Sequence, residues 1–312
     1  MTPESPSPSA TVVLLVKNGA AHLDDLLSAL AAQEVEGGLE VVAIDSGSTD
    51  ASLAMLERAP VRLIRIAPRE FDHGATRNRG AREARGRFVV FLTQDALPLD
   101  TRFVQRLAAA LESDPKVAGA FARQVPRADA DPLTRRELAA WVAAGDLPRT
   151  VYADPEHLAA LSPLARHRLG AFDNVASAVR RDVLLAHPFE STRFGEDAEW
   201  GVRMLRLGYG LAYVPDAVVS HSHARTARAL LRRNYLGHRL LFRLFGLRTV
   251  PDLSHFLRAC LGAIGTDLST LAREGGSPGQ WLAAPAQALA ATYGQYRGAS
   301  DEAAARPYPD WA

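Results

Sequence analysis

The clearest absence in the sequence is cysteine, because Cys260 is the one cysteine among 312 residues. A single thiol excludes an internal disulfide and a cysteine-rich zinc site, and it fits a reducing compartment. Excess charge of either sign is also missing, since 36 lysines and arginines face 35 aspartates and glutamates. No run of basic residues alternates with aromatic residues, so we expect no binding to nucleic acid.

Long apolar runs are missing as well, and no stretch is expected to span a bilayer. The first ten residues, MTPESPSPSA, have neither a basic segment nor an apolar segment, so we expect no signal peptide. We interpret residues 1–10 as a disordered tail and expect a cytoplasmic protein. Apolar residues still form 47% of the chain, which is enough for the core of one large domain with an appendage.

The sequence does contain a regular alternation of strand-like and helix-like segments. Apolar runs predict strands, and helical spacing predicts helices between them. The predicted strands are 11–16, 39–44, 61–66, 88–92, 116–125 and 213–219, and the predicted helices are 20–33, 50–58, 74–85 and 101–112. This alternation favours an α/β fold with a doubly wound, mostly parallel sheet. Residues 126–168 contain helical stretches to which we assign no role.

Acidic residues follow two of these strands, at the sheet edge where open α/β sheets bind ligands. Residues 88–92 lead into Gln94 and Asp95, and residues 39–44 lead into Asp45. Asp95 is either a metal or phosphate-site residue or the cap of the next turn. Asp45 either accepts the ring N–H of a pyrimidine base, which we favour, or forms an Asx turn. We interpret Asp50 as a helix cap.

Three further polar stretches carry candidate chemistry. Residues 71–78, FDHGATRN, lead into a helix N-terminus suited to phosphate, where Arg77 adds a charged donor fork. Glu196 and Asp197 raise one another's proton affinity, which suits one of them to general-base catalysis; the alternative is an acidic first helical turn stabilised by the dipole. His221 and His223 follow a strand and point the same way, so either or both are candidate cation ligands.

Together these stretches resemble the inverting glycosyltransferases of family 2, which have the GT-A fold, a Rossmann-like mixed sheet. The resemblance covers about residues 11–239 and rests on LLVKNG, VVAIDSGSTD, FDHGATRN, FLTQDALP, DNVASAVRRDVL, FGEDAEW and VVSHSH, in that order. FDHGATRN and TQDA look like the bacterial rhamnosyltransferase branch. The resemblance implies a dTDP- or UDP-sugar donor, a divalent cation (Mg²⁺ or Mn²⁺), and inverting transfer, first of all of rhamnose, to a glycan or lipid-linked acceptor in surface polysaccharide or glycolipid assembly.

Carried over residue by residue, the resemblance implies that Asp197 is the catalytic base. It places Asp95 and a histidine on the cation, with His221 preferred over His223 because it directly follows the strand. Asn174 and Glu196 fall on the acceptor side. The donor-binding residues that it implies are Val16, Lys17, Asn18, Asp45, Arg77 and Gln94.

The sequence departs from the wider family at the metal site, where Thr93 replaces the first aspartate of Asp-x-Asp. A single carboxylate still suits Mg²⁺, which takes much of its coordination from water and substrate phosphates. The Q-x-x-R-W signature of processive members is also missing, so we expect addition of one sugar or a few.

Two functions of other classes stay open. A sugar-nucleotide pyrophosphorylase needs a Gly-rich nucleotide loop after the first strand, which this chain lacks. A nucleotide-sugar-binding protein without catalysis would not need both Asp95 and Asp197.

The C-terminal third is predicted to be helical. We expect helices at 224–245, near 253–273 and near 280–296, so that a catalytic domain at 11–224 is followed by a helical region at 225–300 and a loose tail at 301–312. The first helix carries a stripe of arginines, namely Arg225, Arg228, Arg232, Arg239 and Arg243. No acidic residue lies between Asp216 and Asp252, so the stripe could rest on anionic lipid, which would make the protein peripheral at the inner face of the membrane. The alternatives are a solvated face or a phosphate-facing wall of the active site.

Overall fold

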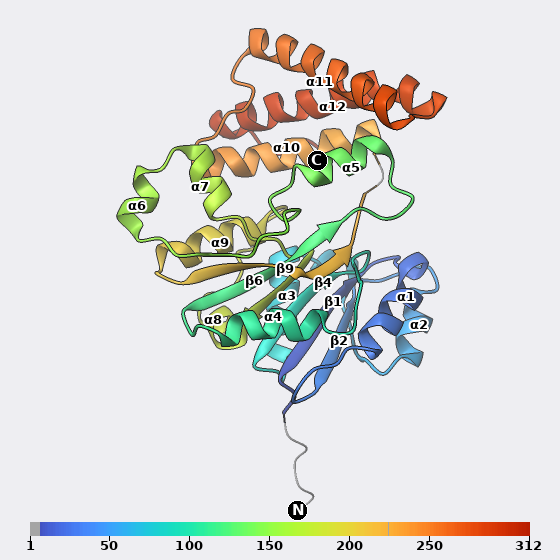
Figure 1. The fold of residues 1–312 in the computed structure, drawn as a ribbon, viewed down its shortest axis with the longest axis vertical. Helices are drawn as coiled ribbons and strands as arrows, with labels where there is room; N and C mark the ends of the chain where they lie inside the picture. Colours follow the sequence, from blue (N-terminus) through green and yellow to red (C-terminus); the bar gives the residue numbers. More distant parts are fainter. Residues whose placement is uncertain (1–6, 224) are drawn as a thin grey trace, which may run out of the picture.

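The computed structural model describes residues 7–223 and 225–312, and a mixed sheet forms their centre. Figure 1 shows helices packed on both faces of this sheet. The strands are β1 (Ala10–Val16), β2 (Leu39–Asp45), β3 (Arg62–Arg65), β4 (Phe88–Thr93), β5 (Leu97–Pro98), β6 (Val117–Val125), β7 (Arg149–Val151), β8 (Ala176–Arg180) and β9 (Gly210–Ser220). Their order is β3-β2-β1-β4-β8-β6-β9-β5, and β7 also pairs with β9. The predicted α/β fold with a mixed sheet is confirmed.

The strand directions bring the predicted site residues to one edge. β1 is parallel to β2 and β4, and β9 is parallel to β6, whereas β8 is antiparallel to both β4 and β6. The carboxyl ends of β1, β2, β4, β6 and β9 therefore meet at the edge where β8 begins. In this register Val16 lies opposite Asp45, and Leu15 lies opposite Thr93.

Two layers of helices cover the sheet, which explains why β4 is apolar without interruption. Val90 of β4 packs in the cluster that includes α1 and α4, and Phe91 packs on the other face with α3, α8 and α9. The helices of this domain are α1 (Ala20–Ala31), α2 (Ser52–Arg58), α3 (His73–Glu83), α4 (Phe103–Glu112), α5 (Pro132–Ala139), α6 (Pro155–Ala160), α7 (Pro163–Leu169), α8 (Arg181–Ala186) and α9 (Glu196–Arg206), with a short 3₁₀ turn at Pro68–Glu70.

The helical C-terminal region is confirmed and consists of α10 (Ala227–Phe245), α11 (Leu253–Glu274) and α12 (Pro278–Ala303). Figure 1 shows these helices stacked at one end of the sheet, with α10 nearest to it. Helices α10 and α12 approach closely because Gly298 lacks a side chain: a Cβ there would lie 2.3 Å from the carbonyl oxygen of Tyr235. Among the described residues, none of these helices combines the length and apolarity that crossing a membrane requires.

The prediction of a loose tail from residue 301 is wrong, because this segment packs against α10. Asp301 is only 3% exposed and accepts a hydrogen bond from the Tyr235 hydroxyl at 3.1 Å. The Arg239 guanidinium lies 3.9 Å from the centre of the Tyr308 ring, and the Trp311 ring packs on Tyr235. Aromatic side chains after α12 thus pack this non-helical segment against the helical region.

Two members of the arginine stripe are paired with acidic residues and are not available to a lipid surface. Arg239 is 5% exposed and pairs with Glu302 at 2.6 Å. Arg225 precedes the helix and pairs with Glu137. Both partners are acidic residues distant in sequence, so a search for acidic residues close to the stripe in the sequence could not find them. Arg228, Arg232 and Arg243 are exposed on α10; Ala224, the first residue of the predicted helix, lies outside the described residues.

Candidate active site

The loops after β1, β2 and β4 are held together by hydrogen bonds. The Gln94 carboxamide accepts from the Lys17 backbone N–H at 2.8 Å and donates to the Lys17 carbonyl at 3.0 Å. The Lys17 ammonium donates to the Ser46 carbonyl at 3.0 Å. Asn18, with a φ of 50°, accepts the backbone N–H of Thr49 through its side chain at 2.8 Å. The predicted donor-binding residues Lys17, Asn18 and Gln94 therefore lie together beside the turn after Asp45.

Asp45 forms the Asx turn that the sequence offered as its alternative role. Asp45 is 2% exposed, and one oxygen of its carboxylate accepts the backbone N–H groups of Gly47 at 2.9 Å and Ser48 at 3.1 Å. A carboxylate has about four lone-pair sites, so this turn leaves capacity for a ring N–H. The base-binding role of Asp45 and of its neighbour Val16, which is 2% exposed, stays a prediction.

Asp95, His221 and His223 converge at the ends of β4 and β9. The Asp95 Oδ2 atom lies 3.5 Å from Nε2 of His221 and 3.7 Å from Nδ1 of His223. Ligand atoms that flank a cation with bonds of about 2.1 Å lie about 3 Å apart, so this spacing suits a shared ion. His221 is 3% exposed, and no described residue hydrogen-bonds its Nε2 atom. This orphaned nitrogen, aimed at Asp95, fits a cation site.

The protonation of this cluster also suits a cation. Burial raises the pKa of Asp95, but the two imidazoles that face it, His221 foremost, outweigh burial and hold that pKa well below its usual range. Burial, with the charge of His221, lowers the pKa of His223. One carboxylate and two imidazoles suit Mn²⁺ better than Mg²⁺, because Mg²⁺ prefers oxygen ligands.

Asp197 lies at the N-terminus of α9, which the left-handed Gly195 (φ of 75°) introduces. Its carboxylate accepts the backbone N–H of Asn174 at 2.9 Å and that of Ala198 at 2.8 Å. Burial, followed by the charges of Glu196 and Asp173, raises the pKa of Asp197 to about 7, although Asn174 and Arg77 oppose the shift. A carboxylate with such a pKa is basic enough to take a proton from a hydroxyl group near neutral pH.

Glu196 forms an ion pair with Arg77. Its carboxylate lies 2.6 Å from the Arg77 guanidinium, and it also accepts from the Asn174 carboxamide at 3.3 Å. Arg77 is 6% exposed and lies over the Phe91 ring. The structure thus pairs Arg77 with Glu196, and its predicted contact with the donor stays a prediction.

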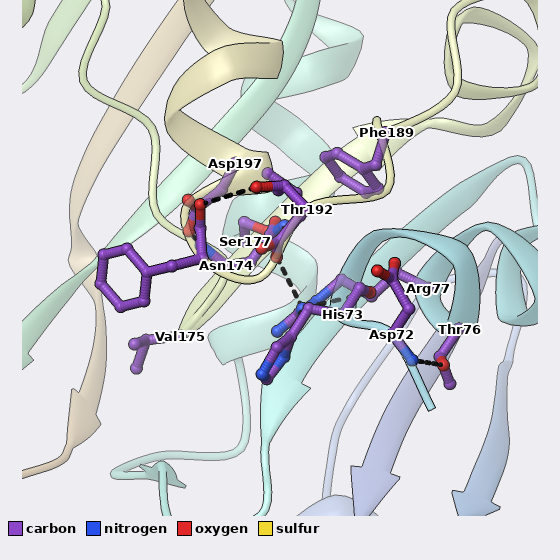
Figure 2. Close-up of polar contacts among 12 residues, drawn as sticks. Asp72, His73, Thr76, Arg77, Asn174, Val175, Ser177, Phe189, Thr192 and Asp197 are labelled. Atoms are coloured by element: carbon purple, nitrogen blue, oxygen red, sulfur yellow. Dashed lines mark hydrogen bonds and ion pairs between the residues drawn. The ribbon is translucent and has the colours of Figure 1, made fainter. Parts of the chain in front are cut away.

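His73 is the first residue of α3 and lies beside Arg77. Figure 2 shows His73 and Arg77 on α3 facing Asn174, Ser177 and Asp197. Burial and then the charge of Arg77 lower the pKa of His73, and Arg232 of α10 adds to the shift. Arg232 of α10 therefore lies close enough to His73 for its charge to act on that ring.

Four residues of the site were missed by the sequence interpretation. Arg127 donates to the Asp95 carbonyl at 2.7 Å. Gln124 contacts His221, and Asp173 contacts both Gln124 and Trp141. Gln124 lies near the end of a predicted strand and Asp173 precedes Asn174, so both positions carried a usable signal. Arg127 and Trp141 fall in the segment without an assigned role.

Comparisons with known proteins agree with this geometry. The sequence profile described as "Glycosyl transferase family 2" matches residues 11–163. The chain is 32% identical over 237 residues to the O-antigen chain rhamnosyltransferase WbaN of Salmonella anatum, covering 73% of this chain and 70% of that protein. It is 29% identical over 230 residues to the O-antigen chain rhamnosyltransferase RfbN of Salmonella typhimurium, covering 72% and 70%.

A solved structure shares the fold. The mannosyltransferase PcManGT from Pyrobaculum calidifontis, in complex with GDP-Man and Mn²⁺, superposes with a TM-score of 0.55 at 19% identity. The match covers 97% of this chain and 77% of that one. The mixed sheet and its attached helices are therefore those of a GT-A fold.

Proposed function

The chain belongs to glycosyltransferase family 2, and from this membership we propose that it transfers a sugar from a nucleoside-diphosphate sugar to an acceptor hydroxyl with inversion at the anomeric carbon. Two features at the same sheet edge carry the proposal together. One is Asp197, whose pKa is raised to about 7, and the other is the cluster of Asp95, His221 and His223. The first is suited to accept a proton, and the second to hold a cation.

In the proposed reaction, Asp197 takes the proton from the acceptor hydroxyl as its oxygen attacks the anomeric carbon. A single displacement inverts this carbon and requires the base and the leaving group on opposite sides of the sugar. Asp95, His221 and His223 would hold a divalent cation, which neutralises charge on the departing diphosphate when bound. The backbone N–H groups of Asn174 and Ala198 hold the Asp197 carboxylate, and burial and the charge of Glu196 raise its proton affinity.

For the donor we propose dTDP-rhamnose first, with a UDP-sugar as the alternative. We propose rhamnose because the relatives are described as rhamnosyltransferases. We propose a pyrimidine base because the remaining lone pairs of Asp45 could accept the ring N–H of thymine or uracil. Guanine also has a ring N–H, whereas adenine does not. A ligand that binds the native state raises the melting temperature, so dTDP and UDP should stabilise the protein more than ADP. Equal stabilisation by ADP would contradict this assignment.

We propose a glycan or lipid-linked acceptor in bacterial surface polysaccharide assembly, used at the cytoplasmic face of the membrane. Support comes from the O-antigen relatives and from the three exposed arginines of α10, Arg228, Arg232 and Arg243. Each basic residue near an anionic surface contributes about 1 kcal/mol. Replacing all three with glutamine should release the protein from vesicles that contain anionic lipid; unchanged sedimentation with the vesicles would contradict the membrane part of this proposal.

The deciding experiment is incubation with dTDP-rhamnose, Mn²⁺ and a lipid-linked glycan extract, with NMR analysis of the product's anomeric configuration. The proposal predicts a new glycosidic bond of inverted configuration. In a parallel incubation with dTTP and rhamnose 1-phosphate, formation of dTDP-rhamnose with release of pyrophosphate would indicate a pyrophosphorylase instead. Tight donor binding with no turnover of any donor would indicate a binding protein.

A further inference from the structure

A chain of hydrogen bonds runs behind His221, away from Asp95. The Nδ1 atom of His221 lies 3.0 Å from the carboxamide oxygen of Gln124. The amide nitrogen of Gln124 donates to Asp173 Oδ2 at 2.7 Å, and the indole N–H of Trp141 donates to the same oxygen at 3.0 Å. The backbone N–H of Val175 donates to the other Asp173 oxygen at 2.9 Å. These contacts connect β6, the turn after α5 and the segment before β8.

Hydrogen-bond chemistry sets the direction of every link in this chain. An ionised carboxylate only accepts, so Asp173 must face the NH₂ group of Gln124. The carboxamide oxygen of Gln124 must then face His221, and because that oxygen only accepts, Nδ1 of His221 must carry the proton. In a neutral imidazole the other nitrogen then has a free lone pair. This nitrogen is Nε2, which lies 3.5 Å from Asp95 Oδ2.

Asp95 alone would favour the opposite tautomer. A carboxylate facing Nε2 of a neutral histidine stabilises a proton on that nitrogen, since the N–H would donate to the carboxylate. A proton on Nε2 would block a cation there. Gln124 is 4% exposed and His221 is 3% exposed, so neither side chain can exchange these partners for bulk water. The buried amide therefore works against the attraction of Asp95.

We propose that Gln124, oriented by Asp173 and Trp141, is a positioning residue that holds His221 in the Nδ1–H tautomer and keeps Nε2 available to a divalent cation. The cation part of this inference rests on the proposed function; the tautomer does not. The proposal also gives a role to Trp141, in the segment whose purpose the sequence left open. Outer partners of metal-bound histidines commonly fix the ring in this way, and their loss weakens metal affinity by about 10–100-fold.

The tautomer can be read in metal-free protein by long-range ¹H–¹⁵N NMR of labelled histidine, at about pH 8, above the ordinary histidine pKa. The His221 signals are assigned by their loss in His221→Asn. The wild type should show a protonated Nδ1 and an unprotonated Nε2. Gln124→Met, of similar size, should move the proton to Nε2, and Asp173→Asn should populate both tautomers because a neutral amide can also donate to Gln124. Gln33→Met, which removes another hydrogen-bonded glutamine whose side chain bonds Asp100 and Val104 and not His221, is the matched control and should leave the His221 tautomer unchanged.

Calorimetric titration with Mn²⁺ alone gives the second readout. Gln124→Met should bind Mn²⁺ about 10–100-fold more weakly than the wild type and Gln33→Met. A wild-type protein with the proton on Nε2, a Gln124→Met protein that keeps it on Nδ1, or equal Mn²⁺ affinity in both would each overturn the inference. If the spectra and titrations follow the prediction while no donor sugar is transferred, the role of Gln124 is supported and the proposed function fails.

Discussion

The Glu196 carboxylate lies 2.6 Å from the Arg77 guanidinium, and both residues are almost fully buried. This pair commits Glu196 to a structural partner on α3. Asp197, the next residue, is held by backbone N–H groups and is half-buried. Two adjacent carboxylates therefore have separate roles: Glu196 supplies a fixed negative charge, and Asp197 has the raised pKa that a base requires.

This relationship predicts the acid limb of the pH–rate profile. Asp197 must be ionised to act as a base, so transfer should fall as the pH drops below its pKa of about 7. Glu196→Gln removes a negative charge that raises this pKa, and the acid limb should move to lower pH.

The matched control is Glu199→Gln, on the same helix, where the carboxylate pairs with Arg203 at 2.8 Å. Its acid limb should stay in place. Because Glu196→Gln also leaves Arg77 without its ionic partner, its melting temperature should be measured alongside. An acid limb that Glu196→Gln leaves unmoved in a folded protein would contradict the electrostatic role of Glu196.

The cation cluster predicts that Asp95→Asn loses Mn²⁺ affinity and metal-stimulated transfer. Asp95 is the one carboxylate of the cluster, and its loss should reduce transfer by about 10²-fold or more, since the cation stabilises the leaving group by several kcal/mol. His221→Ala should do less harm. The control is Asp252→Asn, which alters an exposed aspartate–histidine pair on α11. Full activity of Asp95→Asn with chelator present would show that arginines alone stabilise the leaving group.

Two glycines of the helical region predict opposite effects on stability. Gly298→Ala places a Cβ 2.3 Å from the Tyr235 carbonyl oxygen, so α10 and α12 must separate, and the free energy of unfolding should fall by about 1–3 kcal/mol. Gly262→Ala, on α11, has no atom within 4 Å of the new Cβ and should raise it by about 0.5–1 kcal/mol. Denaturant unfolding measures both. A neutral Gly298→Ala would contradict the close packing of the two helices.

Local sequence patterns were sufficient for much of the fold and the site. The apolar run of β4 predicted a buried strand, and the acidic residues after β2 and β4 were expected at one sheet edge, where the structure places them. The spacing of apolar residues and the point where each apolar run ends can both be read within a few residues of the site position. The grouping of Asp95 with a histidine came from the family resemblance, and the structure brings both His221 and His223 to Asp95.

Long-range pairings could not be predicted in this way. Arg77 and Glu196 lie 119 residues apart, and Arg239 meets Glu302 across 63 residues. Arg239 was therefore expected on a free surface, although it is buried. The five residues of β8 were not predicted as a strand, because a short run containing two alanines and a serine has weak strand propensity, and its burial between β4 and β6 decides its conformation.

The most direct test of the account is a comparison of donor binding and sugar transfer in Asp197→Asn, measured on one preparation by calorimetry and by product formation. Asparagine keeps the shape of the side chain and removes the base. The account predicts nucleotide-sugar affinity within a few fold of the wild type and transfer reduced by about 10²–10⁴-fold. Transfer by Asp197→Asn at near the wild-type rate, with Glu196→Gln folded but inactive, would contradict the account and assign the base to Glu196.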